Sequence, residues 1–406
     1  MVWNHYYIEY LQPGRIALLK IEKGDSYYFI AITDMKIAMI GHKRIPSREG
    51  GVEIVVEELS KRLVEKGDRV EVYNRRGKGT ANTSLTQNDS RFYRGIRIIN
   101  ILTINKKSFD ALIYSFLATL RAIFGRYDLI HYHAEGPSAM LIIPHMLKIR
   151  TIATIHGLDW QRAKWGGFAT KYLLMGEKIA AKYADEVIVL SKNTQDYFSK
   201  TYNRETHYIP NGVIVPDPIE ADVIEKKYGL RQNAYFLFLA RIVPEKGLHY
   251  LLESYQKLDT EIKLVIAGSS SHSDEYFDRI KAMAAQDNRI IMTGFVDGRE
   301  REELFSNCRA YILPSDIEGM PLSLLEAMSY ARKCIVSDIP ENIEVIKNNG
   351  YVFEKGNSSS LLHQLQELLK AEDGCSDPGH CPNYNLSSFN WDNITDIHKK
   401  LYSNTR

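Results

Sequence analysis

Short apolar segments alternate with amphipathic ones along almost the whole chain after Met35. Each apolar segment ends at a polar or glycine-bearing turn and is followed by a stretch with helical spacing. This alternation is typical of an α/β protein in which helices cover both faces of a parallel sheet. We expect strands at 36–41, 70–73, 96–99, 129–133, 151–155, 186–190, 235–240, 263–267, 289–293, 310–313 and 333–337.

The alternation runs through the sequence twice, and the break between the two series lies at Pro210-Asn211-Gly212. A chain of 406 residues also exceeds the roughly 250–300 residues at which a single core stops growing. The segment before Met35 mixes aromatic and charged residues without a domain pattern, so we expect it to lie outside both sheets. The predicted units are an extension of uncertain order at 1–34, Rossmann-like domains at 35–208 and 209–387, and a terminal helix within 388–406.

Composition removes several classes of protein from consideration. The formal net charge is +2, which favours neither nucleic acid nor a strongly acidic partner. Four scattered cysteines suit a reduced, cytoplasmic interior better than a disulfide framework. No apolar run approaches the ~20 residues of a membrane span, and residues 1–10 do not resemble a signal peptide. The sequence therefore predicts a cytoplasmic protein.

One stretch, 310–328, reads as a buried strand, a polar loop and a helix that begins near Pro321. The free N–H groups at such a helix start suit an anionic or hydroxyl-rich ligand. Glu318 lies in the loop and Glu326 lies two turns inside the helix, so the two carboxylates can hold hydroxyls at two points of one extended ligand. A charged loop and a solvated helix face is the alternative interpretation.

Other polar residues also follow expected strands. Arg241 and Lys246 flank a turn after a buried strand, where two cations can clamp a diphosphate and stabilise it as it leaves. His156 follows another strand, although a lone histidine is often structural. Open α/β sheets bind ligands beyond the carboxyl ends of their strands. If the two sheets face each other, one cleft receives the loops with Gly50, Gly51, His156, Arg241, Lys246, Gly294 and Glu318.

Metal and nucleotide-cofactor motifs are weak or missing. Cys375, His380 and Cys381 are close in sequence but lack a fourth ligand at a known spacing, and we interpret them as loop residues. The chain has no Asp-x-Asp motif, no G-x-G-x-x-G turn and no Walker lysine motif. We therefore expect neither a metal ion nor a cofactor.

As a set, these motifs resemble those of the retaining glycosyltransferases of family 4, which have the GT-B fold of two Rossmann-like domains facing across a cleft. The resemblance runs from Met35 to about Tyr402, and 1–34 has no counterpart in it. Ala240 stands where many members have glycine. The matching stretches are Gly50-Gly51, His156-Gly157, Pro210-Asn211-Gly212-Val213, Ala240 to Gly247, Gly294-Phe295-Val296, and Glu318 with Glu326.

The resemblance implies a role for each matching position. Arg241 and Lys246 would bind the donor diphosphate, and His156 would contact the donor sugar near the reacting carbon. Glu318 would hold the sugar as an orienting and electrostatic group. The remaining donor-binding residues would be Glu326 on the ribose, Gly294, Phe295 and Val296 along the base, the backbone of Gly319, Met320, Pro321 and Leu322 on the sugar, and Gly50 and Gly51 near the phosphate and the acceptor.

The implied reaction moves a sugar from a nucleotide-diphosphate-sugar to a sugar or lipid-linked glycan acceptor, without a metal ion and with retention of anomeric configuration. The leaving phosphate would take the acceptor proton during front-face attack. Bacterial capsule, exopolysaccharide or O-antigen assembly is the expected setting. Two alternatives stay open, a GT-B sugar-nucleotide epimerase and a non-catalytic nucleotide-binding scaffold.

The resemblance also implies that the terminal helix, 393–402, crosses back onto the N-terminal domain with Trp391, Ile394, Ile397 and Leu401 as its apolar face. Contact with the inner face of the cell membrane is a further expectation, because basic residues gather in one region of the first domain. A merely solvated basic face is the alternative. These basic residues are Arg162, Lys164, Lys171, Lys178 and Lys182.

Overall fold

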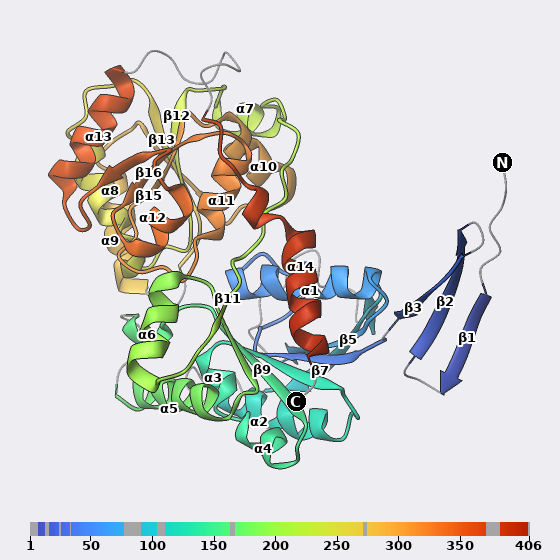
Figure 1. The fold of residues 1–406 in the computed structure, drawn as a ribbon. Coiled ribbons are helices and arrows are strands. Elements are labelled where there is room, and N and C mark those ends of the chain that lie inside the picture. Colours follow the sequence, from blue (N-terminus) through green and yellow to red (C-terminus); the bar gives the residue numbers. More distant parts are fainter. Residues whose placement is uncertain are drawn as a thin grey trace.

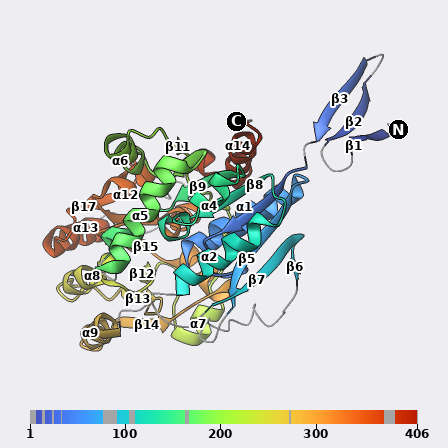
Figure 2. The same cartoon turned by 90° about the horizontal axis from the view of Figure 1, so that it is seen from below.

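The computed structural model shows two parallel-sheet domains and a separate three-stranded sheet (Figure 1). The residues described are 7–12, 16–23, 26–32, 34–76, 91–103, 110–162, 167–270, 274–370 and 382–404. The separate sheet is antiparallel and stands away from both domains (Figure 2). Its strands are β1 (Tyr7–Gln12), β2 (Ile16–Lys23) and β3 (Ser26–Ile32), in the segment for which the sequence showed no domain pattern.

The first domain is built on an eight-stranded sheet with the order β11-β10-β9-β8-β4-β5-β7-β6, parallel except for the edge strand β6. Its strands are β4 (Lys36–Ile40), β5 (Arg69–Arg76), β6 (Phe92–Tyr93), β7 (Ile96–Leu102), β8 (Leu129–His133), β9 (Arg150–Ile155), β10 (Glu186–Val189) and β11 (His207–Tyr208). The helices are α1 (Gly51–Glu65), α2 (Asp110–Ile123), α3 (Glu135–Ser138), α4 (Ile142–Met146), α5 (Phe168–Tyr183) and α6 (Lys192–Tyr202).

The second domain has a six-stranded parallel sheet with the order β14-β13-β12-β15-β16-β17. Its strands are β12 (Tyr235–Leu239), β13 (Lys263–Ala267), β14 (Ile290–Gly294), β15 (Ala310–Leu313), β16 (Lys333–Ser337) and β17 (Tyr351–Phe353). The helices are α7 (Val223–Tyr228), α8 (Leu248–Tyr255), α9 (Asp274–Ala284), α10 (Gly298–Asn307), α11 (Leu322–Ser329), α12 (Pro340–Ile346) and α13 (Ser358–Lys370). The prediction of an α/β fold with two parallel sheets is confirmed.

Each sheet has an apolar cluster on both faces, as the near-continuous apolar strands require. In the first domain, one cluster lies under α2, α5 and α6, and the other lies under α1. The strands that carry site residues, β9, β12 and β15, are central in their sheets. Rigid strands therefore hold the loops that project from their carboxyl ends.

The terminal helix α14 (Trp391–Ser403) belongs to the core of the first domain, although it follows the second in sequence (Figure 1). Asn390 caps it by accepting hydrogen bonds from the N–H groups of Asp392 and Asn393. Arg150 donates to the carbonyl oxygens near its carboxyl end, where cations interact well with the helix dipole. The predicted apolar face was wrong at one position, because Ile397 is 49% exposed while Trp391, Ile394 and Leu401 are buried.

The two domains touch through their glycine-bearing loops. An added Cβ at Gly319 would lie 1.7 Å from the carbonyl oxygen of His156, and one at Gly51 would lie 3.3 Å from Leu322 Cδ1. The amino ends of α1 and α11 therefore face each other from opposite domains. Within the described part of the chain, every helix is too short or too polar to cross a bilayer.

Candidate active site

The loops that follow β9 and β15 meet at the boundary between the two domains. Gly157 has φ of +140°, and an added Cβ there would lie 2.9 Å from the Gly319 Cα. Side chains at either position would push the loops apart, so glycine is needed at both. This contact brings His156 and Glu318 to the same region, as the sequence analysis expects.

Lys246 and Glu318 form an ion pair at this boundary. Lys246 Nζ lies 2.5 Å from Glu318 Oε1, and the two side chains are 14% and 7% exposed. Ser315 Oγ donates a second hydrogen bond of 2.7 Å to the same carboxylate oxygen. Burial lowers the pKa of Lys246, and the carboxylate opposes that shift. The ammonium group is therefore held beside one carboxylate, where a ligand phosphate could compete for it.

Arg241 is a half-buried cation whose side chain makes no hydrogen bond or ion pair with any residue that the structure describes. Burial lowers its pKa, and the charge of Arg162 lowers it further. Its loop is firmly built, because Gly247 has φ of +64° and packs against the carbonyl oxygen of Pro314. An unpaired, desolvated guanidinium is stabilised by an anionic ligand.

Arg162 approaches this cluster from the first domain, and the sequence analysis did not place it in the site. Its guanidinium lies 3.0 Å from the Asp159 carboxylate. Asp159 raises the pKa of Arg162, and Glu318 and Glu245 of the second domain add to that effect. Arg162 therefore belongs to the cleft and not to a lipid-facing surface. Lys164, its neighbour in the predicted membrane region, lies outside the described residues.

Two buried carboxyl groups anchor the turn that carries Arg162. Both oxygens of Glu135 accept from the backbone N–H of Asp159, at 3.1 Å each. Glu177 accepts from Trp160 Nε1 at 3.0 Å and from two tyrosine hydroxyls. Burial raises the pKa of Glu135 well above its usual value, and the Asp159 and Glu177 carboxylates add to the shift. Burial and these neighbouring carboxylates therefore favour the protonated form of Glu135.

The second predicted carboxylate, Glu326, is paired with Arg301 of α10. The Arg301 guanidinium lies 5.3 Å from the centroid of the Phe305 ring. Arg301 was not predicted from the sequence as a site residue, because it lies on a helix with only one short apolar stripe. Glu326 is therefore half of a second ion pair, in which the side chain of Arg301 is 18% exposed and that of Glu326 is 22% exposed.

The segment after β14 offers an open surface. Gly294 has φ of +76° with free space where a Cβ would point, and Phe295 is 46% exposed. Val296 is different, because its side chain is buried in the core and only its backbone is left for a ligand. The side chain of Met320 already has a partner, since its sulfur accepts a hydrogen bond of 2.9 Å from the backbone N–H of Asn211.

The amino end of α1 already holds a carboxylate. An added Cβ at Gly50 would lie 2.3 Å from Glu53 Oε2, and the other Glu53 oxygen accepts from the N–H of Lys43 at 2.9 Å. His156, on the same wall, has Nε2 3.1 Å from Nδ1 of His133. Burial lowers the pKa of His156 to about 4, so its imidazole is neutral at pH 7.

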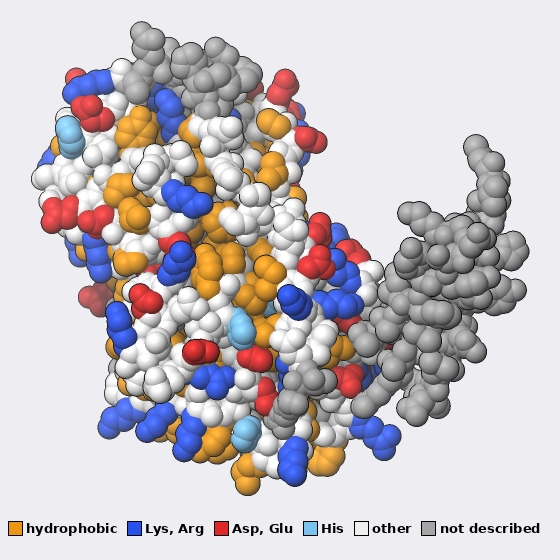
Figure 3. Space-filling view, viewed as in Figure 1, with side chains coloured by type: hydrophobic (Ala, Val, Ile, Leu, Met, Phe, Trp, Pro, Cys, Tyr) orange, Lys and Arg blue, Asp and Glu red, His pale blue; other side chains and the backbone are white. Residues whose placement is uncertain are grey.

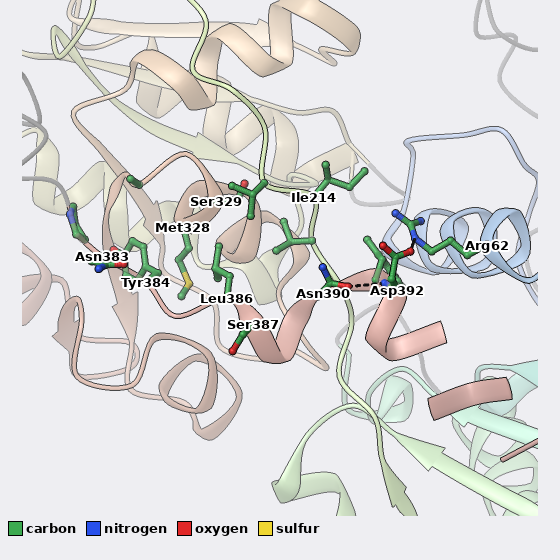
Figure 4. Close-up of a pocket in the computed structure, with 15 residues that line it drawn as sticks. Arg62, Ile214, Met328, Ser329, Asn383, Tyr384, Leu386, Ser387, Asn390 and Asp392 are labelled. Atoms are coloured by element: carbon green, nitrogen blue, oxygen red, sulfur yellow. Dashed lines mark hydrogen bonds and ion pairs between the residues drawn. The ribbon is translucent and has the colours of Figure 1, made fainter. Parts of the chain in front are cut away.

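A separate pocket lies beside residues 213–215, in the linker between the two domains (Figure 4). It is formed where the linker residues 213–215 pass between α11 and the start of α14. None of the predicted site residues lines it. Cys375, His380 and Cys381, interpreted above as loop residues, fall outside the described part of the chain.

Comparison with known families accounts for the fold and for most of the chain. The model of the glycosyl transferases group 1 matches residues 220–380, and that of glycosyltransferase family 4 matches residues 49–215. The two matches fall on the two domains of the structure. The chain belongs to this glycosyltransferase family and has the GT-B fold.

Curated relatives are glycosyltransferases. An uncharacterised glycosyltransferase of Methanocaldococcus jannaschii is 25% identical over 82% of this chain and 89% of its own length. The O-antigen chain mannosyltransferase C of Escherichia coli is 25% identical over 91% of this chain and 98% of its own. A UDP-Gal:α-D-GlcNAc-diphosphoundecaprenol α-1,3-galactosyltransferase of Escherichia coli is 25% identical over 68% and 75%.

Solved structures support the fold. Sucrose-phosphate synthase of Thermosynechococcus elongatus superposes with a TM-score of 0.74 at 20% identity, covering 91% of this chain and 98% of that one. Anabaena HepE in complex with UDP superposes with a TM-score of 0.69 at 16% identity, covering 91% and 100%. At these identities the likeness establishes the GT-B architecture.

Proposed function

We propose that this glycosyltransferase is retaining and metal-independent, and that it moves a hexose from a nucleotide-diphosphate-sugar to a lipid-linked glycan of a bacterial surface polysaccharide. The observation that carries the proposal is the half-buried Arg241, whose side chain has no partner among the residues that the structure describes and which lies beside Arg162 and Lys246. Three cations at the carboxyl ends of two facing sheets suit a diphosphate. The acceptor class is supported by two relatives, an O-antigen chain mannosyltransferase and a diphosphoundecaprenol galactosyltransferase.

In this reaction the diphosphate lies against Arg241 and Lys246, with Arg162 closing from the first domain. Their charges stabilise the negative charge that grows on the phosphate oxygen as the glycosidic bond breaks. The diphosphate shares Lys246 with Glu318, and Glu318 then orients the sugar hydroxyls together with the amino end of α11. Glu326 holds the ribose while Arg301 keeps its carboxylate in place.

The acceptor enters from the side of α1. Glu53 already places negative charge beside Gly50, which suits a neutral acceptor hydroxyl better than a second phosphate. The hydroxyl oxygen attacks the anomeric carbon on the face from which the phosphate departs, and the departing phosphate oxygen takes the hydroxyl proton. Glu318 is engaged with Lys246 and Ser315, so it orients and does not attack.

A panel of donors tests the proposal. Thermal stabilisation and turnover are measured with UDP-, GDP-, ADP- and dTDP-sugars, each with a polyprenyl-diphosphate-linked acceptor and also without one. We expect one nucleotide class to stabilise the protein, and sugar transfer to need the acceptor and to continue at an unchanged rate in EDTA. Epimerisation of the donor alone would establish the epimerase instead. Stabilisation without any turnover would indicate the scaffold, and inversion in the product would overturn retention.

We also propose that the end of the first domain formed by α2, α4 and α5, at the bottom of Figure 1, contacts an anionic membrane surface. Apolar side chains are exposed there on α4, on α5 and directly after α2, including Phe124 at 80%, Met146 at 75% and Phe168 at 67%. Figure 3 shows basic side chains bordering this end over α5. Each well-placed basic residue adds about 1 kcal/mol near an anionic leaflet. The exposed basic residues are Lys148, Lys171, Lys178 and Lys182.

Vesicle sedimentation tests this contact. We expect binding to phosphatidylglycerol vesicles that weakens with added salt, and little binding to phosphatidylcholine. Lys171→Glu with Lys178→Glu should abolish it, whereas Lys257→Glu with Lys263→Glu in the second domain serves as the charge-matched control. Binding that ignores lipid charge, or no binding at all, would leave only a solvated basic face.

A further inference from the structure

Four histidine rings form a row from α14 to the cleft. His398, His131, His133 and His156 follow one another with centroid separations of 6.2, 4.2 and 5.3 Å. His131 and His133 are two residues apart on β8, so their side chains lie on the same face of the sheet. Both are fully shielded from solvent. The row therefore meets the cleft only at His156.

The hydrogen bonds along the row use most of its nitrogens. His131 is bonded on both sides, at 2.7 Å to the Tyr402 hydroxyl and at 2.7 Å to the Thr154 hydroxyl. His133 is bonded through Nδ1 to His156 Nε2. Nε2 of His133 is buried and has no hydrogen-bond partner among the described residues. The direction of the bond between His133 and His156 therefore depends on where His133 carries its proton.

The rings are neutral at pH 7, because burial lowers the pKa of His133 well below 6.5 and that of His156 to about 4. A neutral imidazole has one N–H donor and one acceptor nitrogen. A proton on Nε2 of His133 would be a buried N–H without an acceptor, which costs about 1–3 kcal/mol. A buried N–H left unpaired is rarer in proteins than an unpaired acceptor. His133 therefore favours a proton on Nδ1.

We propose that His133 is a positioning residue that sets the tautomer of His156. His133 Nδ1–H donates to His156 Nε2, and His156 then carries its own proton on Nδ1. That nitrogen makes no hydrogen bond with any residue that the structure describes, so it is left for the cleft. His156 consequently offers the donor sugar an N–H donor and not a base. This use of His156 rests on the proposed function, whereas its tautomer does not.

Nitrogen-15 spectra of histidine-labelled protein test the tautomer directly in the absence of substrate. Long-range proton–nitrogen correlations distinguish Nδ1–H from Nε2–H rings, and His156→Asn identifies the signals of His156 by their loss. We expect His156 to be an Nδ1–H ring. An Nε2–H pattern for His156 in the native protein would overturn the proposal, whatever reaction the protein catalyses.

Two substitutions separate positioning from packing. In His133→Asn the amide nitrogen takes the place of Nδ1 and still donates, so His156 should keep its Nδ1–H form and kcat/KM should stay within about threefold. His133→Phe keeps an aromatic ring but cannot donate, so His156 should shift to Nε2–H and kcat/KM should fall about tenfold, because the wrong tautomer disorients the group. His145→Asn on α4, whose ring packs on Tyr183 outside the row, is the control.

Melting temperatures are recorded for every variant, since both rings of β8 are core residues. If His133→Phe keeps the native tautomer of His156, or if His133→Asn loses it, the proposal fails even with full activity. If the tautomer changes as expected but kcat does not, His133 still sets the tautomer of His156. The proposed contact between His156 and the donor sugar is then wrong. The two failures are therefore distinguishable.

Discussion

The two walls of the cleft are built from different chemistry. The wall from the second domain carries charged groups held in pairs, Lys246 with Glu318 and Arg301 with Glu326. The wall from the first domain carries neutral imidazoles whose pKa values are lowered by burial, with His156 at the surface. Charged pairs can exchange a protein partner for a ligand phosphate at modest cost. Neutral rings cannot, and they can only orient hydrogen bonds.

This difference separates binding from orientation. Because two of the three ion pairs described above lie on the wall from the second domain, donor affinity should depend mainly on that domain. Because the rings on the other wall are buried and neutral, the first domain should carry most of the pH dependence of stability. The following experiments test the comparison, beginning with the largest expected effect.

Acid should destabilise the first domain before the second. Burial lowers the pKa of His156 and of His398 to about 4, whereas an unfolded histidine has a pKa of about 6.5. The unfolded chain therefore binds protons that the native state cannot, and stability falls as pH drops from 6.5 towards 4. Each such group accounts for on the order of 3 kcal/mol over that range. Urea midpoints between pH 7 and 4.5 measure the loss.

Two further measurements assign this loss to the histidines. His398→Leu should flatten the pH dependence, because one titrating group is removed. Hydrogen exchange at pH 5 should accelerate in β8 and β9 before it does in β12 and β15. Equal midpoints at pH 7 and pH 5 would remove the contrast between the two walls.

Loss of Lys246 should be the largest single effect on activity. Lys246→Ala is expected to lower kcat/KM by about 10²-fold or more, the scale of one preorganised charge contact. Arg241→Lys should also lower kcat/KM, since an ammonium group cannot reproduce the bidentate contact of a guanidinium with phosphate. Steady-state kinetics with a working donor check both. Lys66→Ala, which removes an exposed ion pair with Asp396, should leave kcat/KM unchanged.

The melting curves of these variants should differ. Lys246→Ala leaves the Glu318 carboxylate buried without its cation, so it should melt earlier than the native protein. Adding Glu318→Gln should restore stability but not activity. Arg241→Lys breaks no ion pair among the described residues and should melt normally. Near-normal kcat/KM in Lys246→Ala would remove this residue from the site.

Arg162 should have a smaller effect, because it reaches the diphosphate from the opposite wall and is already paired with Asp159. We expect Arg162→Ala to lower kcat/KM by about tenfold, mostly through KM, since Arg241 and Lys246 of the second domain would still hold the diphosphate. Arg204→Ala, which removes a guanidinium that donates to the carbonyl oxygens of Ala184 and Asp185, is the matched control. An effect as large as that of Lys246→Ala would mean that the walls share the phosphate equally.

The smallest effect, on stability, is expected for Glu135, which anchors the turn that carries Arg162. Glu135 has a pKa raised well above its usual value by burial, so its contribution to stability is present at low pH and is lost as pH rises through the raised pKa. Glu135→Gln keeps a neutral group and should be more stable than the native protein at pH 8 by roughly 1 kcal/mol, with no gain at pH 4.5. Urea midpoints at both pH values check this. A loss at pH 8 would show that Glu135 is ionised in the fold.

Local pattern alone indicated most of this fold. All eleven predicted strands appear, since each is a compact, largely apolar run. The short edge strands β6, β11 and β17 were not predicted, because two or three residues carry no periodic signal. The three strands before Met35 were also missed, in a segment without an apolar pattern that matched either domain.

The sequence by itself determined most of the groups that the second wall offers, although not Arg301. Arg241 and Lys246 share one loop, and Glu318 and Glu326 lie in another loop and the helix that follows it, so strand ends and helix starts place them without knowledge of the rest of the chain. Their pairing with one another was not visible, because the 2.5 Å contact of Lys246 with Glu318 joins two loops 72 residues apart.

The tertiary structure alone decided the first wall. Arg162 enters the cleft because Glu135 and Glu177 hold its turn from below, and His156 is oriented through a row that ends on α14, more than half the chain away. Such contacts depend on strand order and on the return of the terminal helix. The physical reason is that the burial of a side chain and its hydrogen-bond or ion-pair partners depend on distant segments that pack together. The periodicity of a sequence indicates only the local secondary structure of neighbouring residues.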